Sequence, residues 1–227
     1  MRILAIADEI DRGLTVARMR AMQVDLVVSC GDLPFEYLEF VMGAMNKPLF
    51  YVPGNHDPEV AHRDPFINSG FAGGPMLRLP DHEALWGPGP GPEGGINLDG
   101  EVVEHKGLRI AGLGGSIRYR PEVANQYTEK EMQRRVRKLI RAAGRPRYRR
   151  RRPIDLLVTH SPPLGVGDMP DEAHRGFESF HALIDRLGPK LMVHGHIHPH
   201  GFDKPDREIG PTLIANVIPH RILEVNP

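Results

Sequence analysis

The sequence predicts an α/β fold in which most strands are parallel, and three observations support this prediction. Short apolar segments with the character of strands alternate with helical segments over residues 1–52. Polar residues follow directly after several of these apolar segments, where open α/β sheets bind their ligands. The chain has 227 residues, of which 40% are hydrophobic and 26% charged, as is typical of a globular protein. We therefore expect a single domain that spans residues 1–227.

The amino-terminal part contains three expected strands and two expected helices. The strands are short runs rich in apolar residues: Ile3–Ala7, Asp25–Ser29 and Leu49–Val52. Thr15–Met22 has the composition of a helix. Phe35–Met45 places apolar side chains at helical spacing, and Pro34 suits the first helical position. This order of strands and helices predicts parallel strands joined by helical crossovers.

Residues 58–100 depart from this alternation. The segment contains two runs rich in glycine and proline, one at Phe71–Pro75 and one at Trp86–Pro92. Loops of this length inside a domain are uncommon and usually have a function. We interpret the segment as a long surface insertion with little regular structure.

Regular structure is expected again after residue 100. Glu101–His105 and Leu108–Leu113 flank a Lys-Gly turn and predict a β-hairpin. Thr128 and Glu131 form a capping box that begins a helix. The apolar face of that helix consists of Met132, Val136, Leu139, Ile140 and Ala143, and the helix ends at Gly144 and Pro146. The other expected elements are a helix at Phe177–Leu187 and strands at Ile154–Thr159, Leu191–Val193, Thr212–Ala215 and Ile222–Val225.

The charge of the chain argues against a general affinity for nucleic acid. With 29 Lys plus Arg and 29 Asp plus Glu, the formal net charge is 0. One segment, Arg141–Arg152, is rich in arginine, and it either contacts a nucleic acid or another polyanion or is a solvated connector. We favour the connector because the whole chain is neutral and Tyr148 is the only aromatic residue in the segment.

The cellular setting is also indicated by the sequence. Cys30 is the only cysteine, so no internal disulfide forms and no oxidising compartment is needed. The apolar run at Ile3–Ala7 is too short to cross a membrane, and no signal-peptide pattern precedes it. We expect a cytoplasmic protein that does not enter a membrane. The oligomeric state is left open.

Polar groups placed just after apolar segments are the candidates for a functional site. They are Asp8, Gly31–Asp32, Gly54–Asp57, His160 and Gly195–His198. Two carboxylates, one amide oxygen and three imidazoles in these groups can bind two divalent metal ions, and the mixed oxygen and nitrogen set suits Mn, Fe, Zn or Ni. His196 and His198 lie on the same side of an extended segment, so each can serve one ion.

This spaced set resembles the calcineurin-like metallophosphoesterase superfamily. The signature of that family runs Asp-x-His, Gly-Asp, Gly-Asn-His-(Asp/Glu), His and Gly-His-x-His. Four of its five blocks stand intact and in order in this chain, from Asp32 to His198. The resemblance implies an αββα sandwich of two mixed β-sheets flanked by helices.

The resemblance also implies roles for individual residues. The implied metal ligands are Asp32, which would bridge two ions, Asn55, His160 and His196 for one ion, and Asp8 and His198 for the other. His56 would protonate the leaving group, and Asp57 would orient His56. The implied reaction is hydrolysis of a phosphoester bond by a metal-activated hydroxide.

The first block departs from the family pattern. Ile10 stands where the family has a histidine ligand, and isoleucine cannot bind a metal. The ion at Asp8 is therefore expected to bind more weakly or to be a different metal. Asp11 or Glu9 can compensate, since both carboxylates lie in the same turn. This acidic turn favours an ion that prefers oxygen, such as Mn²⁺ or Mg²⁺, and Mn is the metal we expect.

A finer resemblance lies in the carboxyl-terminal half. Thr159–Gly165, His174–Gly176 and Lys190–His196 are similar to the branch that contains the brain-type metallophosphoesterase-domain proteins. That branch acts broadly on phosphodiesters, so the expected substrate is a phosphodiester, either a small molecule or a nucleotide. The missing histidine at Ile10 motivates the alternative of a catalytically weak or inactive protein that acts as a binding or scaffold module.

Three further residues are left open between a functional and a structural role. His174 either contacts a phosphate or packs at the surface. Arg118 and Arg120 follow a glycine-rich turn and either clamp a phosphate or are solvated.

Overall fold

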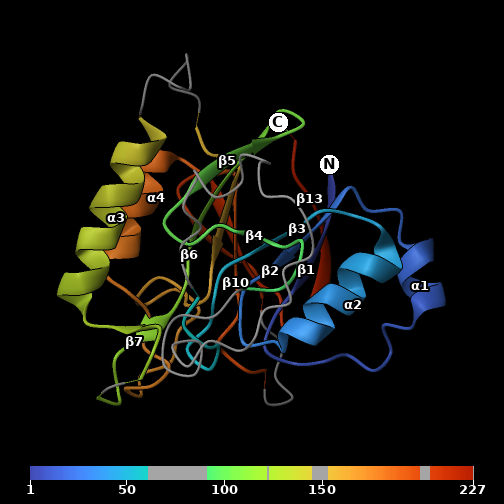
Figure 1. The fold of residues 1–227 in the computed structure, drawn as a ribbon. Coiled ribbons are helices and arrows are strands. Elements are labelled where there is room, and N and C mark those ends of the chain that lie inside the picture. Colours follow the sequence, from blue (N-terminus) through green and yellow to red (C-terminus); the bar gives the residue numbers. More distant parts are fainter. Residues whose placement is uncertain (61–90, 122, 145–152, 200–204, 227) are drawn as a thin grey trace, which may run out of the picture.

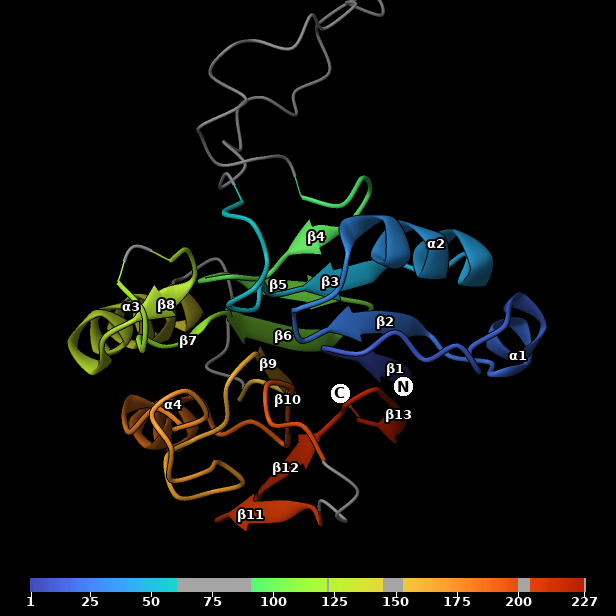
Figure 2. The same ribbon diagram turned by 90° about the horizontal axis from the view of Figure 1, so that it is seen from below.

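Two mixed β-sheets pack face to face in the computed structural model of this protein, and helices cover the outer face of each sheet (Figures 1 and 2). The structure describes residues 1–60, 91–121, 123–144, 153–199 and 205–226. This architecture confirms the predicted α/β class and the αββα sandwich implied by the resemblance.

The first sheet has the strand order β13-β1-β2-β3-β4. Its strands are β1 (Arg2–Ile6), β2 (Leu26–Ser29), β3 (Leu49–Tyr51), β4 (Ile96–Asn97) and β13 (His220–Glu224). Strands β1 to β4 are parallel, and β13 is antiparallel to β1. Two helices, α1 (Val16–Ala21) and α2 (Phe35–Met45), cover its outer face (Figure 2).

The second sheet has the strand order β11-β12-β10-β9-β6-β5. Its strands are β5 (Val102–His105), β6 (Leu108–Leu113), β9 (Leu156–Thr159), β10 (Leu191–His194), β11 (Arg207–Ile209) and β12 (Thr212–Asn216). The four inner strands are parallel, and β5 and β11 are antiparallel edge strands. Helices α3 (Glu129–Ala143) and α4 (Ser179–Leu187) cover the outer face, side by side in both views.

The alternation of side chains along each strand builds the layers. In β1, Ile3 and Ala5 face the other sheet and belong to the central core, whereas Leu4 and Ile6 face the helices. From Ile3 to Ile6 both faces of the strand are buried, which explains why these four residues are all apolar rather than alternating with polar ones.

The helix termini follow the predicted signals with two corrections. The capping box of Thr128 and Glu131 is present at the start of α3, and the hairpin of β5 and β6 is also as predicted. Pro34, however, is the N-cap of α2 with ψ 136°, so the first helical residue is Phe35. Helix α4 begins at Ser179, two residues later than the prediction of Phe177.

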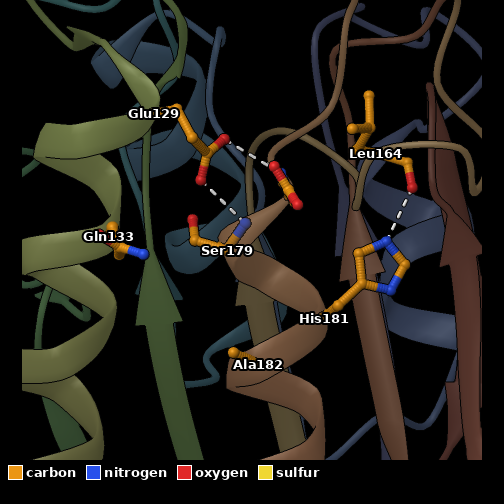
Figure 3. Close-up of a pocket in the computed structure, with 7 residues that line it drawn as sticks. Glu129, Gln133, Leu164, Ser179, His181 and Ala182 are labelled. Atoms are coloured by element: carbon orange, nitrogen blue, oxygen red, sulfur yellow. Dashed lines mark hydrogen bonds between the residues drawn. The ribbon is translucent and has the colours of Figure 1, made fainter.

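The late start of α4 has a physical cause. The carboxylate of Glu129, at the start of α3, accepts hydrogen bonds from the backbone N–H groups of Glu178 at 3.0 Å and Ser179 at 2.9 Å (Figure 3). These N–H groups have no partner within the helix, so a side chain from the neighbouring helix caps them. Such a cap cannot be inferred from the local sequence.

Some predictions fall outside the described residues or were incomplete. Most of the expected insertion, residues 61–90, and the arginine-rich residues 145–152 lie outside the described part. Within the insertion, β4 adds a parallel strand to β3, where little regular structure was expected. The short parallel pair β7 (Ser116–Ile117) and β8 (Gln126–Tyr127) was not predicted, nor was β11. Where the chain is described, its helices are too short or too polar to cross a membrane.

Candidate metal centre

The loops that follow five parallel strands meet at one end of the sandwich. Asp8 follows β1, Asp32 follows β2, Asn55 follows β3, His160 follows β9, and His196 and His198 follow β10. Because parallel strands end on the same edge of a sheet, and the two sheets pack face to face, loops from both sheets come together there. Contacts between the two sheets confirm this, since His160 Nε2 lies 3.3 Å from Asp32 Oδ2.

The backbone at this edge is unusual. Asp8, Asp32 and His196 have φ angles of 59°, 56° and 65°, in the left-handed region that residues with side chains seldom adopt. Such conformations cost about 1–3 kcal/mol each and cluster at functional sites. Glycine is required beside them, because a Cβ atom on Gly54 would lie 2.1 Å from Asp32 Oδ1. The sequence therefore places the carboxylates directly against backbone.

His160 is held in one orientation by a backbone group. Its Nδ1 donates a hydrogen bond to the carbonyl oxygen of Cys30 at 2.7 Å. Its Nε2 then faces Asn55 Oδ1 at 2.9 Å and Asp32 Oδ2 at 3.3 Å. A buried nitrogen that faces two oxygen atoms needs either a proton or a metal ion between them. The backbone contact at the far nitrogen is the arrangement that orients histidine ligands in metal sites.

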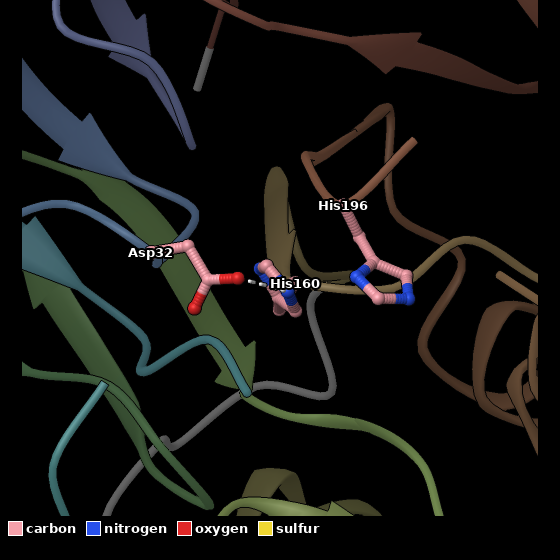
Figure 4. A group of neighbouring side chains, drawn as sticks. All are labelled: Asp32, His160 and His196. Carbon is pink, nitrogen blue, oxygen red and sulfur yellow. Dashed lines mark ion pairs between the residues drawn. The ribbon is translucent and has the colours of Figure 1, made fainter. Parts of the chain in front are cut away.

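His196 is held in the same way. Its Nε2 donates to the carbonyl oxygen of Ala173 at 2.7 Å, which leaves Nδ1 for a ligand. The rings of His160 and His196 have centroids 4.8 Å apart. Asp32, His160 and His196 each offer a ligand atom, and these atoms lie within 4.8 Å of one another (Figure 4). This spacing suits a single divalent ion.

The amide of Asn55 is oriented by a residue that the sequence did not single out. Its Nδ2 donates to Tyr119 Oη at 3.3 Å, so Oδ1 points to His160. The loop of Tyr119 is fixed by Gln126, whose Oε1 accepts the backbone N–H of Tyr119 and of Arg120. The sequence indicates a possible role only for the neighbouring Arg118 and Arg120, because a single tyrosine in a loop belongs to no recognisable motif.

The second expected group of ligands, Asp8 and His198, also comes together. The carboxylate of Asp8 accepts the backbone N–H of His196 at 3.0 and 3.1 Å. His198 Nε2 lies 3.7 Å from Asp8 Oδ1, and His198 Nδ1 lies 2.8 Å from Glu9 Oε1. Glu9 is thus at the edge of the centre.

The two carboxylates expected to compensate for Ile10 are placed differently. Asp11 Oδ1 accepts the backbone N–H of Gly13 at 2.7 Å, and Asp11 Oδ2 pairs with His220 Nδ1 at 2.9 Å. Asp11 therefore stabilises its own turn, whereas Glu9 contacts a candidate ligand. Ile10 itself is 50% exposed and adds no packing to the core. Glu9 is therefore better placed than Asp11 to compensate for the ligand missing at Ile10.

Asp57 is placed to brace the loops of the site. Its Oδ2 accepts the backbone N–H groups of Asp32 at 2.9 Å and Gly54 at 2.8 Å. The hydrogen bond to the His56 ring that the resemblance implied is not among those within the described part of the chain. His56 is exposed, and its backbone N–H donates to Asp32 Oδ1 at 2.7 Å. Asp57 thus joins the two loops that carry Asp32 and His56.

The four central groups perturb each other's pKa values. Burial raises the pKa of Asp8 to about 6 and lowers the pKa of His196 to about 3. Burial would also raise the pKa of Asp32, but the charge and hydrogen bond of His160 lower it to about 2. Burial would lower the pKa of His160, but Asp32 raises it to about 9. These opposite shifts favour an ionised Asp32 beside a protonated His160.

Two of the residues left open by the sequence have defined partners. His174 Nδ1 lies 2.8 Å from Asp171 Oδ1, and the His174 ring lies 5.4 Å from that of His196. Arg118 pairs with Glu131 at 3.0 Å and donates to the carbonyl oxygen of Gln126. His174 therefore lies beside the centre, whereas the guanidinium of Arg118 supports the start of α3.

Taken together, the donor atoms fit a divalent metal ion. The partly buried carboxylate of Asp32 converges with the buried side chains of Asn55, His160 and His196, and each ring has one nitrogen held by a backbone carbonyl and the other turned away from it. A buried cluster of this kind is costly unless its charges are compensated, and an ion supplies that compensation.

Comparisons with known proteins agree with this geometry. The model of the calcineurin-like phosphoesterase family matches residues 1–200. A solved structure from Thermus thermophilus, TT1561, aligns with 94% of this chain and 87% of its own at a TM-score of 0.56 and 18% identity, which supports the fold. A second crystal structure aligns with 99% of this chain and 98% of its own at a TM-score of 0.60 and 15% identity.

Two curated relatives are similar in sequence over part of their length. The uncharacterized protein MJ1162 of Methanocaldococcus jannaschii is 26% identical over 130 residues, which are 55% of this chain and 54% of that protein. The UPF0046 protein T07D4.2 of Caenorhabditis elegans is 45% identical over 47 residues, 20% of this chain and 12% of that protein. The matches thus span about half of one relative and a small part of the other.

Proposed function

Because this chain belongs to the calcineurin-like phosphoesterase family, we propose that it is a dinuclear metal-dependent hydrolase that prefers phosphodiesters. The observation that carries the proposal is the convergence of Asp32, His160 and His196, whose ligand atoms lie within 4.8 Å of one another. The side chain of Arg118 is engaged with Glu131 rather than free to clamp a phosphate dianion. This favours a diester, which carries a single negative charge, as does the similarity to the brain-type branch.

In this proposal the ligands divide into two sets around Asp32. One set is Asn55, His160 and His196, and the other is Asp8 and His198, with Glu9 in place of the ligand missing at Ile10. Divalent ions, when bound, activate water and neutralise charge on the phosphoryl oxygens. The acidic surroundings of the second set favour Mn²⁺ over softer ions.

The protein's own groups orient the ligands and supply a proton. The carbonyl oxygens of Cys30 and Ala173 fix the rings of His160 and His196, so that neither ring reorients during the reaction. His56 lies next to Asp32 along the same edge, exposed to an incoming substrate, and donates a proton to the leaving oxygen. Asp57 holds the loops of Asp32 and His56 together through its two backbone hydrogen bonds.

Metal analysis and an activity screen test this function together. The protein is supplemented with Mn²⁺, Fe²⁺, Zn²⁺ or Ni²⁺ and its metal content is measured by elemental analysis. Hydrolysis of bis-p-nitrophenyl phosphate and p-nitrophenyl phosphate is then compared for each metal. We expect bound metal and a higher kcat/KM for the diester, with both metal and activity reduced in His160→Ala. Metal content below about 0.2 equivalents in every case would exclude the proposed centre.

The alternative is a protein of the same fold that binds partners without catalysis. The exposed Ile10 at a ligand position favours this alternative. The same experiment separates the two functions: a protein that holds metal but hydrolyses neither ester with any of the four ions is a binding module.

A further inference from the structure

A cavity of about 410 Å³ opens beside the candidate metal centre. Two loops form its walls. One carries Asp32 into the first turn of α2, and the other carries His56, Asp57 and Pro58. The cavity is therefore continuous with the residues to which we assign metal binding and proton transfer.

We propose that this cavity, the leaving-group pocket, holds the alcohol released from the substrate and selects uncharged, largely apolar alcohols against anionic ones. The proposal rests on the proposed function. In hydrolysis, the water oxygen bonds to phosphorus, the bond from phosphorus to the alcohol oxygen breaks, and that oxygen takes a proton. If His56 supplies the proton, the alcohol must extend from that oxygen into the space that His56 lines.

One wall of the leaving-group pocket is formed by three apolar residues, Leu33, Pro34 and Phe35. Leu33 is buried, and Phe35 is partly buried with its ring 6.3 Å from the ring of Tyr51 in the core. Pro34, between them, is exposed at the N-cap of α2. Three successive apolar residues in the lining are suited to the apolar body of an alcohol rather than to a hydrated group.

The charges around the leaving-group pocket have one sign. Among the residues that the structure describes, its lining includes Asp32, Glu36 and Asp57 and no lysine or arginine. Bound metal would offset the charge of Asp32, and Asp57 is engaged with two backbone N–H groups. Glu36, exposed in the first turn of α2, also lines the pocket. A carboxylate or second phosphate on the alcohol would be repelled.

A second cavity, of about 560 Å³, lies between α3 and α4 (Figure 3), and its described lining residues are not those to which we assign metal binding or proton transfer. Its lining, as far as the structure describes it, includes Glu129, His181 and Leu164 but no candidate metal ligand. Its Glu129 carboxylate caps α4, and His181 Nε2 donates a hydrogen bond to the carbonyl oxygen of Leu164. These groups are used by the fold, so the pocket beside His56 is the better candidate for substrate.

A pair of matched diesters tests the charge selection. Methyl 4-carbamoylphenyl phosphate and methyl 4-carboxyphenyl phosphate differ by one negative charge on the leaving alcohol. We expect a higher kcat/KM for the carbamoyl ester. In Glu36→Gln, the relative kcat/KM of the carboxyl ester should rise by about two- to fivefold, as expected for an exposed charge. Glu39→Gln, on the same helix but outside the lining, should leave the ratio unchanged.

Binding of the released alcohol tests the apolar wall without catalysis. Affinity for 4-hydroxybenzamide is measured by NMR titration of the metal-loaded protein. Phe35→Ala should weaken binding by about tenfold, since an aromatic contact is lost. Phe35→Leu should restore part of the affinity, and Phe40→Ala, an exposed position on the same helix, should have no effect. Thermal melting of each variant shows that it is folded.

The two readouts separate the pocket from the proposed function. An unchanged ester ratio in Glu36→Gln, or equal affinity in folded Phe35→Ala, overturns the assignment of the leaving-group pocket. If no ester is hydrolysed but 4-hydroxybenzamide binds in a manner that depends on Phe35, the hydrolase function fails and the pocket is upheld as a binding site.

Discussion

The Nε2 atom of His196 lies 2.7 Å from the backbone carbonyl oxygen of Ala173, which lies on a turn outside the strands of the sheets. This contact makes the turn part of the metal centre, because it determines which nitrogen of His196 is free. The turn is held by Asp171, whose Oδ1 accepts the backbone N–H groups of Ala173 and His174 and contacts His174 Nδ1.

Asp171→Ala should therefore weaken metal binding although Asp171 is not a ligand. Loss of the turn leaves the His196 ring less well oriented, and disruption of such supporting contacts typically lowers metal affinity by about 10-fold or more. The affinity is measured by competition with a chelating dye. Asp185→Ala, with an 80% exposed side chain on α4, is the control. Equal affinity in both variants would show that Ala173 does not orient His196.

Ile10→His should increase the affinity of the site at Asp8 and His198 for its metal ion. An added imidazole restores the ligand of the family pattern and favours Zn²⁺ over Mn²⁺. Because Ile10 is half-exposed, the change costs little packing. We expect the ratio of bound Zn to bound Mn, measured by elemental analysis after loading with both ions, to rise by about tenfold. Ile10→Leu is the control, and an unchanged ratio would mean that Glu9 already acts as the ligand.

Much of the fold was predictable because local signals agree with it. The apolar runs of β1, β2 and β9 are buried on both faces, so composition alone marks them. The capping box at Thr128 fixes the start of α3. The start of α4 was missed because its cap comes from Glu129, about fifty residues earlier in the chain. Two-residue strands such as β4 depend on pairing with a neighbour and carry no periodic signal.

The site was predictable where residue type and order carry the chemistry. Asp32, Asn55, His160 and His196 follow strands, and the sheet edge brings them together as expected. Groups that act through backbone contacts were not predictable. The carbonyl of Ala173 could belong to any residue, and only the fold places it against a ligand. Asp57 was a predicted site residue, but its contacts with two backbone N–H groups could not be predicted.

The capping box of α3 should contribute measurably to stability. Thr128 Oγ1 accepts the backbone N–H of Glu131, and Glu131 Oε2 accepts the backbone N–H of Thr128 at 2.8 Å. Thr128→Ala should lower the free energy of unfolding by about 1 kcal/mol in urea denaturation at pH 7. Lys130→Ala, exposed in the same turn, is the control. A change within about 0.3 kcal/mol of this control would contradict the role of the cap.

The contribution of Glu131 should depend on pH. Hydrogen bonds from Thr128, together with Arg118, lower the pKa of Glu131 from its usual value of 4.5. A carboxyl with a lowered pKa in the folded state stabilises the fold above its unfolded pKa, and that stabilisation is lost as the pH falls through the folded value. The difference in unfolding free energy between the parent and Glu131→Gln should therefore shrink between pH 7 and pH 3.

His56→Ala should lower kcat without removing the metal. The His56 side chain is exposed beside the leaving-group pocket, and only its backbone N–H contacts Asp32. A positioned general acid is typically worth about 10²–10⁴ in rate. We expect a loss of that size for diesters with alkyl leaving groups and a much smaller loss for p-nitrophenyl esters, because p-nitrophenolate departs with little protonation. Both rates and metal content are measured on the same preparations.

Asp57→Ala is the variant with which His56→Ala is compared, because it should affect the metal rather than proton transfer. Asp57 fixes the backbone of Asp32 and Gly54, so its removal should reduce metal content and lower kcat on both kinds of ester alike. An equal loss on both leaving groups in His56→Ala, with metal retained, would point to substrate positioning instead of proton transfer. Loss of metal in His56→Ala would instead assign His56 to the structure of the loop, because an acid that touches only the substrate leaves the ligands of the ion in place.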